Sequence, residues 1–247
     1  MNHAPFKIIG AERPSRWLIT ADHASNAVPH AVNGGTLGLP FVDMQRHIAY
    51  DIGAAGVTER LAQLLDAPAI LSNFSRMVID PNRGENDPTL LMRLYDGTII
   101  PGNRHADDAE KTRRLDAYHR PYHAALAKLA ARQENTVICA VHSFTPRLNG
   151  RHPRPWQVGI LHAPADGRLA IPLIKRLEQE PDLNVGDNEP YLGHLPGDSI
   201  DRHALQHGRP NVLIELRQDL IADAQGQNEW SERLAPILED VLNQTGL

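Results

Sequence analysis

The sequence contains a single cysteine among its 247 residues, so no disulfide bond can form within the chain. Cys139 lies in the apolar run TVICAVH, where we expect it to be a buried small side chain. Structural disulfides are typical of secreted proteins and rare in the cytosol. No stretch approaches the ~18 apolar residues of a membrane span, and the N-terminal residues lack a secretory-signal pattern. We therefore expect a cytoplasmic protein with no membrane partner.

The sequence also lacks an excess of positive charge. The 25 Lys and Arg residues stand against 30 Asp and Glu, for a formal net charge of -5. Nucleic-acid binding needs a basic surplus that neutralises phosphates, so a nucleic-acid partner is not expected. The motifs GxSxG, GxGxxG, GxxxxGK and HExxH are missing too, which argues against serine esterases, Rossmann dehydrogenases, P-loop enzymes and zincins. Small molecules are the expected partners.

Short apolar runs alternate with segments of helical period, which is the pattern of an α/β fold. We predict strands at 17–21, 68–74, 76–80, 136–142, 156–162 and 211–217. We predict helices at 42–65, 106–132, 167–179 and 228–244, the second of them bent or divided at Pro121. With 41% hydrophobic residues, the chain has enough apolar material for one core. The prediction is a single α/β domain over residues 1–247, with a central mixed, mostly parallel sheet flanked by helices.

Residues 81–105 form a segment rich in turn formers that is too long for an ordinary connection. Loops of this length in compact domains are usually functional. We expect this segment to cover a site and to restrict it to small molecules.

Polar side chains stand at the ends of three predicted strands, where ligands bind in open α/β sheets. Asp22 and His23 follow the first strand, His142 ends a second, and Glu215 lies near the end of a third. Two imidazoles could hold Zn²⁺ with a third protein ligand and a water, and Glu215 could then act as the base for that water. The alternative is that each histidine only hydrogen-bonds a neighbouring loop.

Three residues around the predicted strand 76–80 are candidates for binding a substrate carboxylate: Arg76, Asn82 and Arg83. A guanidinium can grip a carboxylate through paired hydrogen bonds, although either arginine could instead form a surface salt bridge. Arg113, on the predicted helix 106–132, is a further candidate for the same role.

The run HIAYD spaces His47 and Asp51 four residues apart, which places them on one face of a helix. Asp51 could supply a carboxylate to the metal or orient a ligand histidine. A surface ion pair explains the spacing equally well.

Six blocks in order resemble those of the N-formylglutamate amidohydrolase family and span residues 22–221: DHASNAVP, RHIAYDIGA, FSRMVIDPNR, VHSFTP, GDNEPY and NVLIELRQDLI. That family is similar in turn to the zinc carboxypeptidase and aspartoacylase group, which implies a zinc-carboxypeptidase-like hydrolase fold and one zinc ion per chain. The resemblance implies that His23 and His142 bind zinc and that Glu215 is the catalytic glutamate. It also implies that Arg76, Asn82 and Arg83 bind substrate, and that Arg76 is catalytic as well, because it could stabilise the developing oxyanion.

One position departs from the zinc-binding HxxE pattern of that group. Asn26 stands where the pattern has glutamate, and a neutral amide is a poorer zinc ligand. The third ligand is therefore open among Asn26, Asp51, Asp43 and Asp22. We rank Asp51 first because an anionic oxygen on the same helix face as His47 would compensate for the missing glutamate.

The resemblance implies metal-dependent hydrolysis of the amide bond of a small N-acyl amino acid, with N-formyl-L-glutamate as the first candidate. Two alternatives stay open: an anion-binding relative that has lost its metal through the change at position 26, and a zinc peptidase of small peptides. The sequence does not specify the acyl group, the amino acid or the oligomeric state.

Overall fold

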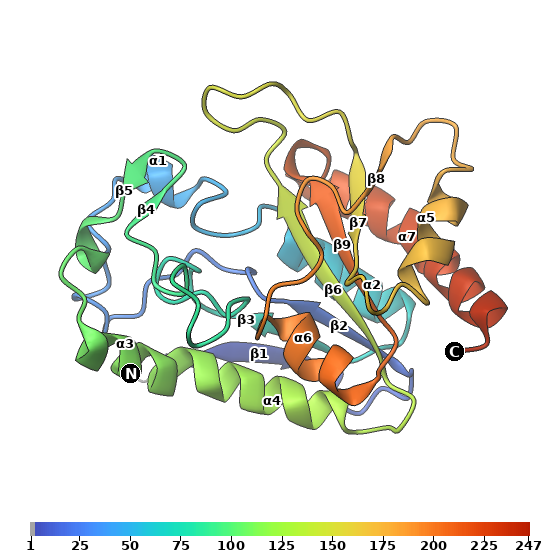
Figure 1. Ribbon diagram of the computed structural model, residues 1–247, viewed down its shortest axis with the longest axis horizontal. Coiled ribbons are helices and arrows are strands. Elements are labelled where there is room, and N and C mark those ends of the chain that lie inside the picture. Colours follow the sequence, from blue (N-terminus) through green and yellow to red (C-terminus); the bar gives the residue numbers. More distant parts are fainter. Residues whose placement is uncertain (1–2) are drawn as a thin grey trace.

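A seven-stranded sheet forms the centre of the computed structural model, which describes residues 3–247 (Figure 1). Its strands are β1 (Phe6–Ile9), β2 (Trp17–Ala21), β3 (Ala69–Ser72), β6 (Val137–Phe144), β7 (Val158–Leu161), β8 (Val185–Asp187) and β9 (Asn211–Arg217). Their spatial order is β1-β3-β2-β6-β9-β7-β8. The four strands from β3 to β9 are mutually parallel, β1 runs antiparallel to β3, and β7 runs antiparallel to β9. The predicted α/β fold with a mostly parallel sheet is confirmed.

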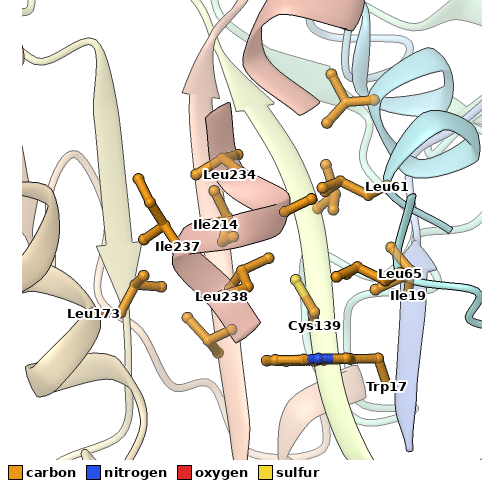
Figure 2. Close-up of a cluster of buried hydrophobic side chains, with 14 of the residues drawn as sticks. Trp17, Ile19, Leu61, Leu65, Cys139, Leu173, Ile214, Leu234, Ile237 and Leu238 are labelled. Carbon is orange, nitrogen blue, oxygen red and sulfur yellow. The ribbon is translucent and has the colours of Figure 1, made fainter. Parts of the chain in front are cut away.

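Helices cover both faces of this sheet. On one face lie α2 (Ala54–Leu64), α5 (Ala170–Leu177) and α7 (Ala224–Thr245), and on the other lie α4 (Arg120–Ala130) and α6 (Ser199–His203). Successive side chains of a strand point to opposite faces, so Trp17 and Ile19 join the first core while Leu18 joins the second. Figure 2 shows the first core, with Cys139 between Trp17 and Ile214. Cys139 is buried as expected, and burial raises the pKa of its thiol to about 12.

The predicted helix at 42–65 is wrong between residues 45 and 53. Helix α1 (Phe41–Met44) ends after four residues, and α2 begins only at Ala54. Gly53 precedes α2 with a φ of 81°, and a Cβ atom there would lie 2.0 Å from the carbonyl oxygen of Ile221. This left-handed residue interrupts helical geometry. His47 and Asp51 therefore lie in an irregular segment and do not share a helix face.

The predicted strand at 76–80 is also wrong, although its apolar side chains are buried. Backbone N–H groups of this run donate to carbonyls of loop residues, and two of its carbonyls accept from side chains, instead of pairing with a neighbouring strand. Asn103 Nδ2 donates to the Met77 carbonyl and Arg114 Nη1 donates to the Val78 carbonyl, at 2.7 and 2.8 Å. A buried apolar run can satisfy its backbone in either way, so the run alone does not determine a strand.

The predicted long helix is divided close to Pro121, as expected. Helix α3 (Asp108–Arg114) passes through a π-helical turn (Leu115–His119) into α4, whose second residue is Pro121. Proline cannot donate a backbone hydrogen bond to the preceding turn, and a π-turn is one way for a helix to accommodate it.

The long segment 81–105 contains a small hairpin of β4 (Leu94–Tyr95) and β5 (Thr98–Ile99), which lies beside α1 in Figure 1. Arg46, just after α1, joins the two, because its guanidinium donates to Thr98 Oγ1 and to Asp96 Oδ2. Within residues 3–247, no helix has both the length and the apolar character needed to cross a membrane.

Candidate metal centre and active site

The parallel strands bring three predicted site residues to one edge of the sheet. His142 in β6 and Glu215 in β9 are direct partners in the strand register. His23 follows the end of β2, the neighbour of β6 on its other side. The carboxyl ends of parallel strands meet at one edge, which is why the sequence placed these residues together correctly.

Asp51 lies between the two histidines. Its Oδ2 atom is 3.3 Å from His23 Nδ1 and 2.9 Å from His142 Nδ1. One ligand atom from each of the three residues lies within 4.8 Å of the other two, and all three side chains are buried. The backbone positions Asp51, because its N–H donates to the His23 carbonyl at 2.9 Å.

The Nε2 atom of each imidazole, on the side of the ring away from Asp51, faces another buried carboxylate. His23 Nε2 donates to Asp80 Oδ1 at 2.7 Å, and His142 Nε2 lies 3.4 Å from Asp22 Oδ2. Asp22 is itself fixed by the hydroxyls of Tyr122 and Ser199, at 2.6 and 2.9 Å. A carboxylate behind a histidine holds the proton on that side of the ring and leaves the other nitrogen as a metal ligand.

The charges of this cluster favour a cation. Burial alone would keep the carboxyl groups neutral, but the neighbouring imidazoles outweigh it and lower the pKa of Asp51, and of Asp22 to about 2. The pKa of His142 is raised well above its usual value, because Asp22 and Asp51 more than offset the effect of burial. The same carboxylates that hold a proton on His142 would attract a metal ion.

This donor set fits zinc. Two imidazole nitrogens and one carboxylate oxygen are a known three-residue ligand set of catalytic zinc, and they leave a fourth position for water or substrate. Asp51 provides the anionic oxygen that Asn26 does not offer. Asn26 donates to the carbonyl of Met44, and Asp43 pairs with Arg46, so neither belongs to the cluster.

Glu215 is buried beside this cluster, and its Oε2 atom has no hydrogen-bond partner among residues 3–247. Burial raises the pKa of Glu215 to about 7, and the negative charge of Asp51 acts in the same direction. A carboxyl group with a pKa near neutrality can both accept and release a proton, which is the property of a general base that later acts as an acid.

Arg76 lines the same cavity and bonds to the carboxylates of the cluster. Its Nε and Nη2 atoms donate to Asp80 Oδ2 at 3.1 and 2.8 Å, and its Nη1 atom lies 3.6 Å from Asp51 Oδ1. The guanidinium also lies over the ring of Tyr95, 5.4 Å from its centroid. Arg76 therefore links the carboxylate behind His23 with the carboxylate between the histidines.

A cavity of about 310 Å³ opens onto these groups. Asn82, Arg83 and Tyr95 of the segment 81–105 line it, so this segment borders the site as expected. Its remaining wall includes aromatic and leucine side chains that sequence reasoning did not single out: Phe144, Leu161, Tyr191, Leu192, Leu195 and Leu213. Phe144 and Tyr191 belong to the blocks VHSFTP and GDNEPY, whose order in the sequence was the available signal.

Two other predicted residues have different positions. His47 lines the cavity and lies 3.4 Å from Asp96, but it is not part of the metal cluster. Arg113 does not line the cavity, and its guanidinium pairs twice with Glu110 at 2.7 Å. Asp80 was not predicted as a site residue, because it closes an apolar run that reads as a strand.

Comparisons with known proteins agree with this description. The model of the family described as N-formylglutamate amidohydrolase matches residues 15–222, well over half of the chain. A gene product of Agrobacterium tumefaciens of known crystal structure is 31% identical, with a TM-score of 0.93 over 100% of this chain and 98% of its own. The N-formylglutamate amidohydrolase of Ralstonia eutropha JMP134 is 22% identical, with a TM-score of 0.70 over 98% of this chain and 100% of its own, which shows a shared fold. A search of the curated proteins gave no match.

Proposed function

The chain belongs to the N-formylglutamate amidohydrolase family, and from this premise we propose that it hydrolyses the amide bond of a small N-acyl amino acid with a bound divalent metal. N-formyl-L-glutamate is the first candidate substrate, and zinc is the first candidate metal. The products would be formate, or another small acid, and a free amino acid.

One observation carries the proposal: a buried His–Asp–His cluster and a buried carboxyl group with raised pKa face the same cavity. His23, Asp51 and His142 supply the ligand atoms, and Glu215 supplies the proton acceptor. Titratable groups with perturbed pKa values cluster at catalytic sites. An anion-binding protein would gain nothing from a buried glutamate with an unpaired oxygen, so this observation favours an enzyme over the non-catalytic alternative.

A zinc ion held by His23, Asp51 and His142 would polarise the acyl carbonyl and make a nearby water acidic. Glu215 takes the proton of the attacking water through its unpaired Oε2 atom. It then gives that proton to the nitrogen of the leaving amine, which completes the exchange of the C–N bond for a C–O bond. Because burial raises the pKa of Glu215, its carboxylate accepts the proton of the attacking water more readily than an exposed carboxylate would.

Arg83 and Asn82 hold the carboxylate of the amino-acid portion. Arg83 lines the cavity, and within residues 3–247 only its Nε and Nη1 atoms form hydrogen bonds, with Thr89 and with the Asn82 carbonyl. Its Nη2 atom is left to bind an anion, and a charge-assisted hydrogen bond is the stronger kind. Arg76 is committed to Asp80, so we assign it to holding the carboxylates of the cluster and offsetting their charge.

The cavity volume supports a small substrate. About 310 Å³ lies at the lower end of the range for small-molecule sites, which favours an N-acyl amino acid over a peptide. The test is a panel of N-formyl and N-acetyl amino acids assayed with added Zn²⁺ and, separately, with a chelator. We expect release of the acid from at least one N-formyl amino acid only when the metal is present. A zinc-loaded protein that cleaves no member of the panel would contradict the proposal.

A further inference from the structure

Three buried histidines lie next to one another in a row and do not line the cavity. His119 lies at the end of the π-helical turn, His123 lies one turn further along α4, and His203 ends α6. The ring centroids of His119 and His123 are 4.4 Å apart, and those of His123 and His203 are 5.2 Å apart. The hydrolytic mechanism uses none of these three residues, which we call the histidine ladder.

Hydrogen bonds determine which nitrogen of each ring carries the proton. His123 Nε2 and His119 Nε2 face the carbonyl oxygens of Pro81 and Arg83, both at 2.9 Å, and a carbonyl can only accept. His123 Nδ1 then accepts from His203 Nε2, also at 2.9 Å. Burial lowers the pKa of all three imidazoles, which keeps the ladder neutral.

The ladder ends on the segment that presents Asn82 and Arg83 to the cavity. The two carbonyls that it holds flank Asn82 on either side. Two polar groups of Asn82 itself are also fixed, because its N–H donates to Asp80 Oδ1 at 2.8 Å and its Oδ1 accepts from the N–H of Ser199 at 3.2 Å. The backbone of the proposed carboxylate subsite is therefore bonded at every residue from 81 to 83.

The surroundings of His119 indicate that a histidine stands at this position for its hydrogen bond and not for its packing. Its side chain is fully buried, its Nε2 atom bonds the Arg83 carbonyl, and its Nδ1 atom has no partner among residues 3–247. A buried polar atom without a partner lowers stability, so an apolar ring would suit this position better if filling space were the only need. An apolar ring would lack the donor that bonds the Arg83 carbonyl.

We propose that His119, His123 and His203 are positioning residues that fix Asn82 and Arg83 in the geometry that selects substrates with a free carboxylate. The inference rests on the proposed function for its substrate and on the hydrogen bonds above for its geometry. The same two helices hold Asp22 through Tyr122 and Ser199, so α4 and α6 align the carboxylate subsite with the metal cluster.

The test compares three variants of the zinc-loaded protein. His119→Gln retains a donor close to the position of Nε2, His119→Asn is too short to reach the Arg83 carbonyl, and His119→Phe keeps only the ring. The exposed His207 provides the control, as His207→Phe. For each protein, kcat and KM are measured for an N-formyl amino acid and its carboxamide, together with metal content and hydrogen exchange at the amides of residues 82–84.

In His119→Phe and His119→Asn, we expect KM for the acid to rise about threefold to tenfold, the scale of one neutral hydrogen bond. Values of kcat, carboxamide hydrolysis and metal content should stay near the wild type. Exchange at residues 82–84 should accelerate, and His119→Gln should restore both properties. The Asn and Gln pair decides the question even if His119→Phe does not fold.

An unchanged acid-to-carboxamide ratio with unchanged exchange in both His119→Phe and His119→Asn would overturn the inference, and so would a His119→Gln protein as impaired as His119→Asn. Failure of the proposed function gives a different result. In that case the wild type cleaves neither substrate, and the exchange measurement alone decides whether the ladder positions residues 82–84.

Discussion

Replacing Glu215 by glutamine should lower turnover and raise stability at the same time. Glu215→Gln removes the proton acceptor, so we expect kcat to fall at least ~10²-fold, the scale of a lost general base. The variant also removes a carboxyl group that burial makes costly to ionise. A folded-state pKa of about 7 against the ordinary 4.5, at ~1.4 kcal/mol per pKa unit, corresponds to about 3 kcal/mol.

The sign of the stability effect depends on pH. Because the pKa of Glu215 is raised in the folded state, its contribution to stability is intact below pH 4.5 and is lost as pH rises to about 7. Glutamine does not titrate. The variant should therefore match the wild type near pH 4.5 and exceed it in unfolding free energy above pH 7.

The assay is denaturant unfolding of both proteins after metal removal, from pH 4.5 to 8, alongside turnover of the zinc-loaded forms. Glu178→Gln is the control, since Glu178 is exposed. A Glu215→Gln protein that is no more stable than the wild type at pH 8 would refute the claim that ionisation of buried Glu215 lowers the unfolding free energy. Near-normal turnover would refute the assignment of the base.

Three further perturbations test other parts of the site. Arg83→Ala should reduce kcat/KM for substrates with a free carboxylate about tenfold to a hundredfold, because a hydrogen bond to a charged group contributes ~1.5–3 kcal/mol. The values for the matching carboxamides should change little. An unchanged ratio between acid and carboxamide would show that the carboxylate binds elsewhere. Asp80→Asn should weaken zinc affinity about 10–100-fold in a competition titration with a chelator, because His23 loses the carboxylate that orients it, and an unaltered affinity would remove Asp80 from this role. Gly53→Ala should lower the unfolding free energy by more than ~1 kcal/mol in denaturant titrations. Position 53 has a left-handed backbone conformation, and the new methyl group would collide with Ile221. Wild-type stability of the variant would contradict that geometry.

The sheet and its catalytic edge could be predicted from the sequence because they follow from a general rule. His23, His142 and Glu215 each stand at or near the end of an apolar run, and parallel strands align such ends. The register of His142 with Glu215 confirms that their strands are neighbours. Nothing more than strand type and strand ends was needed to bring the three together.

The residues that hold these groups could not be predicted in the same way. Asp51 reaches the histidines through its backbone bond to His23 and the left-handed Gly53, not through the expected helix face. Asp80 and the histidine ladder depend on pairings between residues 36 to 80 positions apart. Tertiary packing determines such pairings, and the local periodicity of the sequence does not predict them.

Metal content is the most direct test of the central claim, that His23, Asp51 and His142 hold one divalent metal ion. Wild type, Asp51→Asn and Asp43→Asn are dialysed against Zn²⁺, freed of excess metal and analysed for bound metal per chain. Asp43 is the control, because it lies outside the cluster and pairs with Arg46. The account predicts one zinc ion in the wild type and in Asp43→Asn, and its loss from Asp51→Asn. A wild type without zinc, or equal occupancy in all three proteins, would contradict it.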